Sequence, residues 1–163
     1  MHELTAKEMF AARDANEGAA ATVLGQMLFE FARLDTALGL CLVWSQRGSD
    51  VDSLTIKVAA MTFHKKLDFL RQVIELHTQE VKMHAAYSQW IERADQARLM
   101  RNDLVHGRWG VEAYGLHVIN VVGLPTSSEQ RATPYTLRQL ERFLDDMKML
   151  QIDLNRLRSR WPL

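Results

Sequence analysis

Residues 101–107 read RNDLVHG and close the third long helical segment of the sequence. Asn102 and His106 are four residues apart, so on a helix their side chains lie one above the other on one face. Arg98 and Arg101 occupy the sector of the helix that would otherwise pack against the core. A buried or half-buried guanidinium needs a partner, because desolvating an unpaired charge is costly. The cluster therefore predicts either a structural ion pair or a site for a negatively charged ligand.

The hydrophobic periodicity changes directly after this segment. Residues 109–122 are rich in β-branched and aromatic side chains, with glycines at intervals. This pattern predicts a two-stranded β-hairpin over about residues 108–122, with its turn near Tyr114-Gly115. Residues 123–135 contain a glycine and two prolines and are predicted to form a loop.

Helical segments surround the predicted hairpin. A short first helix is expected to begin at Thr5, where the residues fit a capping box, and to end near Gly18. The long helices are predicted over about residues 19–46, 52–78, 82–106 and 136–160. We therefore expect an all-α fold: an up-down bundle of four long helices with a short N-terminal helix and a β-hairpin insertion before the last helix, in a single domain over residues 1–163.

Apolar side chains recur at helical spacing in three of the long segments, which defines the faces expected in the core. These faces comprise Val23, Met27, Phe31, Leu34, Leu38 and Cys41 in the first long segment, Ile56, Ala59, Phe63, Leu67, Leu70 and Ile74 in the second, where His77 continues the face, and Leu140, Phe143, Met147, Leu150, Leu154 and Leu157 in the last. The last set repeats at spacings of three and four, a heptad seam suited to near-parallel helix packing.

Composition restricts the classes of function. The chain has 163 residues, with 20 Lys+Arg and 20 Asp+Glu, and this balance argues against a protein that coats DNA or a membrane electrostatically. The same balance argues against coating of nucleic acid in general, RNA included, but it does not exclude a small local basic site. No apolar run approaches the ~20 residues of a membrane span, and the N-terminal residues lack a signal-peptide apolar region. The one cysteine, Cys41, allows no disulfide or cysteine metal site within one chain. We expect a cytoplasmic protein that uses no cofactor and no metal.

The pattern from Arg101 to His106, an arginine and a histidine separated by four residues, resembles the signature of the HEPN superfamily of small helical domains. The agreement extends to Asn102 directly after the arginine, and the motif lies at the end of a long amphipathic helix, as in prokaryotic members. The resemblance implies a metal-independent endoribonuclease that acts as a homodimer, in which two copies of the motif build one composite site. Antitoxin-controlled members often carry a tyrosine two residues after the histidine, where this chain has Arg108. Control by nucleotidylation of that tyrosine is therefore not implied.

The residue types suit RNA cleavage. An imidazole can deprotonate the 2′-hydroxyl and protonate the leaving 5′-oxygen, and a guanidinium matches the phosphate oxygens. We therefore predict Arg101 and His106 as catalytic residues and Asn102, Arg98 and Arg108 as substrate-binding residues. The expected partners are single-stranded RNA, a second copy of the chain and an antitoxin protein, in phage defence or a toxin–antitoxin system. No DNA or membrane partner is expected.

Other interpretations stay open. Arg101 could pair structurally with Asp35 or Glu30, while His106 could cap the carbonyls at the helix end. The chain would then be a non-catalytic HEPN-like module that binds a nucleotide or a protein. A third possibility is a dimeric scaffold that uses the seam Leu140–Leu157 to bind a partner protein. The arginines at 156, 158 and 160 suit a helix C-terminus or, alternatively, an RNA-binding tail.

Overall fold

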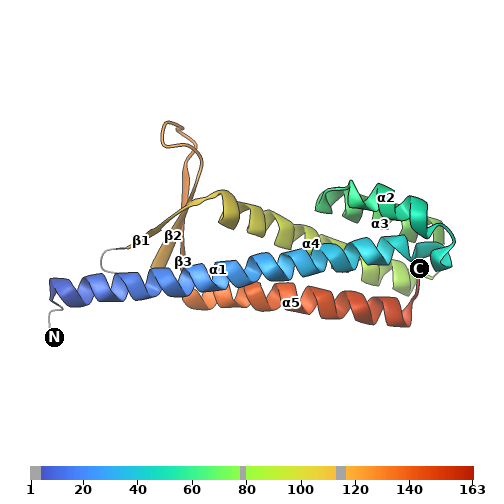
Figure 1. Cartoon of the computed structure of the whole chain (residues 1–163), viewed down its shortest axis with the longest axis horizontal. Coiled ribbons are helices and arrows are strands. Elements are labelled where there is room, and N and C mark those ends of the chain that lie inside the picture. The colour runs from blue at the N-terminus through green and yellow to red at the C-terminus, as the bar shows by residue number, and fades with distance from the viewer. Residues whose placement is uncertain (1–4, 78–79, 113–116) are drawn as a thin grey trace. The chain divides into compact units, whose positions relative to one another are not determined.

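The computed structural model describes residues 5–77, 80–112 and 117–163 and is mostly helical, with a three-stranded antiparallel sheet before the last helix (Figure 1). The elements in chain order are α1 (Ala6–Val43), a 3₁₀ turn η1 (Ser45–Gly48), α2 (Val51–Ala59), α3 (Phe63–His77), α4 (Val81–His106), β1 (Arg108–Val111), β2 (His117–Val122), β3 (Arg131–Thr136) and α5 (Leu137–Arg160). The prediction of an all-α fold is therefore wrong, since α and β elements are combined. None of the described helices is long and apolar enough to span a membrane.

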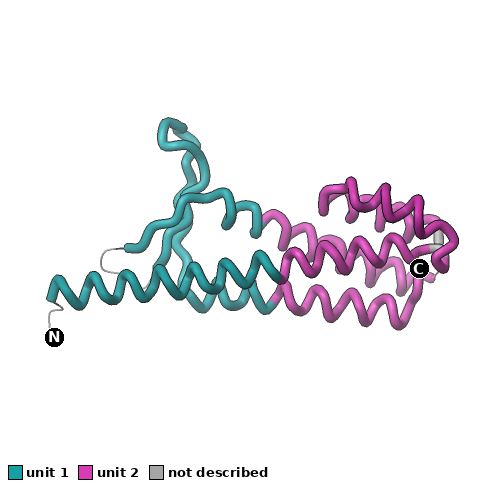
Figure 2. The backbone as a smooth tube through the Cα atoms, in the orientation of Figure 1, with its two compact units in different colours: residues 1–29, 100–145 teal, residues 30–99, 146–163 magenta. Residues whose placement is uncertain are grey.

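The chain forms two compact units (Figure 2). Unit 1 comprises residues 1–29 and 100–145, and it contains the sheet. Unit 2 comprises residues 30–99 and 146–163, and in the described part of the chain it is helical. The expectation of a single domain over the whole chain stays a prediction.

Helix α1 is continuous, so the predicted break at Gly18 is wrong. The backbone of Gly18 does not adopt a positive φ, and the Thr22 hydroxyl donates a hydrogen bond to its carbonyl at 2.9 Å. Residues 19–21 are all alanine, the strongest helix former, and they carry the helix past the glycine. A glycine inside a helix costs only about 1 kcal/mol relative to alanine, which such a neighbourhood tolerates.

Both capping boxes predicted from the sequence are present. The Thr5 amide and hydroxyl donate to the Glu8 carboxylate at 2.8 and 2.7 Å, which lowers the pKa of that carboxyl group. The Thr136 amide donates to Gln139 Oε1 at 2.8 Å, and the Gln139 amide donates back to Thr136 Oγ1 at 3.2 Å. The N-termini of α1 and α5 are therefore set by local side-chain hydrogen bonds.

The long helix predicted over residues 52–78 is two helices, α2 and α3. The Met61 amide donates to the Val58 carbonyl at 3.1 Å, a tight turn that ends α2, and Thr62 Oγ1 accepts from the Lys65 amide at the start of α3. Because of the break, the buried face of α2 is formed by other residues than an unbroken helix would place there. Val58 is buried in α2, whereas Ile56, which the unbroken pattern placed in the core, is 76% exposed.

The predicted hairpin is confirmed as the pair β1–β2, with Arg108 opposite Val121 and Val111 opposite Val118. Its predicted turn near Tyr114-Gly115 lies outside the described residues. The prediction of a loop over residues 123–135 is wrong in its last part, because β3 pairs with β2 and completes a sheet of order β1-β2-β3. Proline is compatible with β3 because β3 is an edge strand.

One face of the sheet packs within unit 1. Val118 and Asn120 are buried on this face. The Tyr135 ring lies 6.1 Å from the Trp109 ring and 6.0 Å from the Phe143 ring of α5, measured between ring centroids. The aromatic contacts connect both outer strands and the first turns of α5 around the buried centre of the sheet.

Unit 2 has an apolar core formed by segments of α1, α3, α4 and α5. Its largest fully buried side chains include Trp90, Tyr87, Leu34, Leu38, Leu67, Leu70, Ile74, Ile91 and Leu150. The Trp90 indole donates to the Leu150 carbonyl, and the Tyr87 hydroxyl donates to the Trp161 carbonyl, each at 2.9 Å. The polar atoms of the two buried aromatics are thus satisfied by backbone acceptors at α5 and just after it.

Lys66 is buried, and its ammonium group donates to the Asp35 carboxylate at 2.7 Å. We predict that Asp35→Ala lowers the free energy of unfolding by about 1–3 kcal/mol, because it leaves a buried charge without its counterion. The loss is below that of a fully buried pair because the Asp35 side chain is 38% exposed. Lys66→Met removes the charge and keeps the apolar length, so urea denaturation should show a smaller loss. A larger loss for Lys66→Met than for Asp35→Ala would contradict this account.

Candidate functional site

The segment RNDLVHG forms the junction between α4 and β1 in unit 1. Helix α4 ends at His106, the Gly107 amide closes the last turn on the Asp103 carbonyl at 3.0 Å, and β1 begins at Arg108. The Trp109 indole donates back to the Leu104 carbonyl at 2.8 Å. The Leu104 carbonyl at the helix end therefore receives a donor from the strand that comes after it.

Asn120 of β2 lies directly beneath this junction and is 1% exposed. With its amide oriented so that both polar atoms are satisfied, it donates to the Asp103 carbonyl at 3.2 Å and accepts from the Trp109 indole at 3.3 Å. A Cβ atom on Gly107 would overlap the Asn120 amide. A side chain at residue 107 would therefore force the buried Asn120 amide to move.

Asn120 is the site residue that sequence reasoning missed. The available signal was a single amide in the strand VINVV, residues 118–122, where every neighbour is apolar and β-branched. A polar side chain at an inward position of a strand has to find a partner. Its partners come from a helix end and another strand, which only the three-dimensional structure brings together.

Arg101 and Asn102 are brought together by the structure. The Arg101 guanidinium donates to the Asn102 side-chain oxygen at 2.8 Å, and both residues are half-buried. Arg101 also borders a cavity of about 300 Å³ in unit 1. The other lining residues are apolar or glycine: Ala21, Leu24, Gly25, Met27 and Leu28 from α1, and Leu104 and Val105 from α4. Asn102 thus orients a guanidinium at the border of an apolar groove.

His106 and Arg108 are exposed on either side of Gly107. His106 occupies the last position of α4, one turn after Asn102. Arg108 lies on the face of β1 opposite the packed face that carries Trp109. Both side chains are accessible to a ligand in solution.

Asp103 has a structural partner. Its carboxylate forms an ion pair with the Arg131 guanidinium of β3, and both side chains are largely exposed. The pair connects the last turn of α4 to the edge strand. Because it is solvent-exposed, its contribution to stability is small.

Arg98, a predicted substrate-binding residue, belongs to unit 2 and is engaged there. Its Nε donates to the Asp95 carboxylate at 2.7 Å, and the His64 ring lies 3.5 Å from the same oxygen. The hydrogen bond from Arg98 lowers the pKa of Asp95. Two other carboxylates that the sequence offered as partners for Arg101 also have contacts in unit 2: Asp35 pairs with Lys66, and Glu30 accepts from Gln151.

The lowered pKa of Asp95 predicts a pH dependence of stability. A carboxyl group with a lower pKa in the folded state stabilises the fold at neutral pH, and this contribution is lost as the pH falls through the carboxyl range, near ~4. Asp95→Asn should therefore flatten the decline in unfolding free energy between neutral and acidic pH. Urea denaturation at several pH values would measure this. Equal slopes for wild type and Asp95→Asn would contradict the prediction.

Within the described residues, no three histidine, cysteine, aspartate or glutamate side chains gather closely enough to hold a metal ion. Comparisons of the chain with protein-family models, curated proteins and solved structures give no match.

Proposed function

We propose that this chain is a metal-independent endoribonuclease that acts as a homodimer through a composite site of Arg101 and His106. The observation that carries the proposal is the arrangement of side chains at the C-terminal end of α4. His106 is exposed there, and Arg101 is oriented by Asn102 at the border of an open groove. We also propose that the helices form an up-down bundle, the arrangement that the resemblance to HEPN domains implies.

The chemistry requires little beyond these groups. One imidazole takes the proton of the RNA 2′-hydroxyl, and the imidazole of the second copy protonates the departing 5′-oxygen. The two guanidinium groups stabilise the negative charge that develops on the phosphorane. Asn102 positions Arg101, and the exposed Arg108 pairs with a neighbouring phosphate. The product ends in a 2′,3′-cyclic phosphate, and a divalent metal is not needed.

The groove beside Arg101 supports self-association at this end of the chain. Leu28 and Val105 border it and are 45% and 44% exposed. A Cβ atom on Gly25 would meet nothing within 4 Å, so the α1 surface is open there. Apolar side chains gathered around an open, small-residue surface are typical of a protein contact. In a two-fold dimer the same groove on both copies would bring the two motifs together.

The test is cleavage of single-stranded RNA by the purified chain in the presence of EDTA. We expect products with 2′,3′-cyclic phosphate ends and a dimer by light scattering. A monomer, a strict requirement for added Mg²⁺, or intact RNA would overturn the proposal. If the activity belongs to phage defence or a toxin–antitoxin system, induced expression should arrest growth of the host cells.

The alternative is a non-catalytic HEPN-like module that binds a nucleotide or a protein. One observation favours it: Asp103, Gly107 and Trp109 of the same segment all have structural contacts at the junction. In that case RNA or a nucleotide would bind without being cleaved. Filter binding measured beside the cleavage assay separates the two functions.

A further inference from the structure

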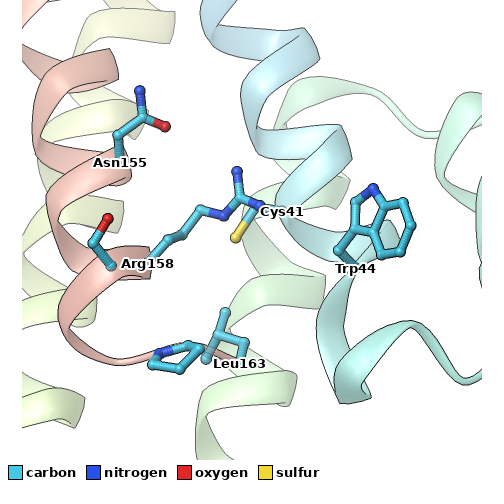
Figure 3. Close-up of a pocket in the computed structure, with 7 residues that line it drawn as sticks. Cys41, Trp44, Asn155, Arg158 and Leu163 are labelled. Carbon is cyan, nitrogen blue, oxygen red and sulfur yellow. The ribbon is translucent and has the colours of Figure 1, made fainter.

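A cavity of about 390 Å³ lies in unit 2, at the C-terminal ends of α1 and α5 (Figure 3). This volume falls within the ~300–1,000 Å³ common among small-molecule sites. The lining residues are Cys41, Trp44, Asn155, Arg158, Ser159, Pro162 and Leu163. No residue of this set belongs to the Arg101/His106 site, so binding of a ligand in this cavity does not depend on RNA cleavage.

Arg158 provides the charge in this cavity. Figure 3 shows its side chain extended across the cavity toward Cys41. Its neighbours on α5 are engaged elsewhere: Arg156 donates to Asp153 at 3.4 Å, and the Arg160 guanidinium lies 4.4 Å from the Trp161 ring. Over the described part of the chain, Arg158 forms no ion pair and no hydrogen bond. Its positive charge is therefore available to a ligand.

Two titratable groups near Arg158, the Cys41 thiol and the Tyr87 hydroxyl, do not supply a competing negative charge. Burial raises the pKa of the Cys41 thiol to about 11, and burial likewise raises the pKa of the Tyr87 hydroxyl. Both groups are therefore protonated at neutral pH. Neither the thiol nor the hydroxyl therefore competes with an anion for the guanidinium.

Trp44 provides an aromatic surface that is held in place. The side chain is 55% exposed and lines the cavity. Gly48, with φ +70°, supports it: a Cβ atom there would lie 2.9 Å from Cε3 and 3.0 Å from Cζ3 of the indole. The indole thus lies against Gly48 and remains exposed, and an exposed indole offers a surface on which a planar ring stacks.

Polar side chains complete the site. Asn155 and Ser159 are one helical turn apart on α5 and share the face that carries Arg158. Both are exposed, and they offer amide and hydroxyl groups as donors and acceptors.

We infer that this cavity binds a small planar organic anion, whose ring stacks on Trp44 and whose phosphate or carboxylate group pairs with Arg158. A guanidinium forms bidentate hydrogen bonds with either acid group. Asn155 and Ser159 then contact the polar edge of the ring or the second acid oxygen.

The test is calorimetric titration of the whole chain with four probes. Adenosine 5′-monophosphate carries a ring and a phosphate, indole-3-acetate a ring and a carboxylate, adenosine a ring alone, and inorganic phosphate a charge alone. We expect at least one ringed anion to bind one per chain, about tenfold or more tighter than adenosine or phosphate. The ringed anion that binds more tightly shows whether the cavity prefers a phosphate or a carboxylate group. Equal affinity for adenosine, or no binding by any probe, would overturn the inference.

Variants locate the binding. Arg158→Gln should weaken it by about 10–100-fold, while Arg156→Gln, the same change two residues earlier on α5, should leave it unchanged. Trp44→Phe keeps an aromatic surface and should still bind the ringed anion. Trp44→Leu removes that surface and should bind the anion less tightly than Trp44→Phe does. Arg101→Ala should bind as wild type, which separates this cavity from the proposed ribonuclease site. Full binding by Arg158→Gln with the fold intact by circular dichroism would contradict the inference.

Discussion

Replacing His106 by alanine is expected to slow RNA cleavage by about 10²–10⁴-fold, the usual contribution of a general acid or base. The free energy of unfolding should hardly change, because the side chain is exposed. Arg101→Ala should cost about 10²–10³-fold through lost stabilisation of the phosphorane charge. Single-turnover cleavage of a labelled RNA, measured with the variants at equal dimer concentration, gives both numbers.

The matched control is His84→Ala. His84 is also exposed and also lies on α4, but it belongs to unit 2, and its ring contacts the Ser88 hydroxyl at 3.5 Å. This variant should cleave RNA at the wild-type rate. Equal activity of His106→Ala and wild type would remove His106 from the mechanism, and equal losses in both histidine variants would point to a general effect on folding.

Mixing subunits tests whether the site is composite. If one site needs His106 from both copies, equal amounts of wild-type and His106→Ala subunits after exchange should retain about one quarter of the activity, since only wild-type homodimers cleave. If each copy carries a complete site, about one half should remain. If one half remains, the proposal of a nuclease would stand, but the proposal that two copies share one composite site would be excluded.

Gly107→Ala is expected to have the largest effect on stability, lowering the free energy of unfolding by about 2–4 kcal/mol. The added Cβ atom would occupy the position of the buried Asn120 amide. To make room, the amide must give up its bonds to the Asp103 carbonyl and the Trp109 indole, or β2 must move away from the helix end. Thermal and urea denaturation would measure the loss.

Gly110 of β1 offers a matched control three residues further on, because a Cβ atom there would meet nothing within 4 Å. Gly110→Ala should therefore be close to neutral. Asn120→Ala alone should cost about 1–3 kcal/mol for the lost hydrogen bonds. The double variant Gly107→Ala/Asn120→Ala should lose less than the sum of the two single losses, because the overlap is gone. Strict additivity would show that the glycine is required for another reason.

The parts of the fold that could be predicted from the sequence are governed by local interactions. The capping boxes at Thr5 and Thr136 were predictable because both partners lie within one turn. The end of α4 and the start of β1 are indicated by a change in periodicity. The break between α2 and α3 was missed because its signal, a threonine before an apolar residue, is common inside helices as well.

The third strand was missed for a different reason. Residues 131–136 contain Pro134 and have no alternation of their own, so locally they are typical of a loop. Pairing with β2 makes them a strand, with Tyr135 turned toward Trp109 and Phe143. Long-range pairing can override weak local preference in this way.

The candidate site shows the same division. Arg101, Asn102 and His106 were found because they share one helix end. Asn120 and Arg131, which contact that end, come from two strands further along the chain. Sequence spacing gives no information on such contacts until the order of the strands is known.

The outer strands of the sheet restrict how copies of this chain can assemble. Strand β3 contains Pro134, which has no amide proton to offer to an incoming strand, and the other outer strand, β1, has only four residues. Such edges disfavour growth of the sheet from molecule to molecule, the route that leads to fibrillar aggregates. The two outer strands thus disfavour association of copies of this chain through the edges of the sheet.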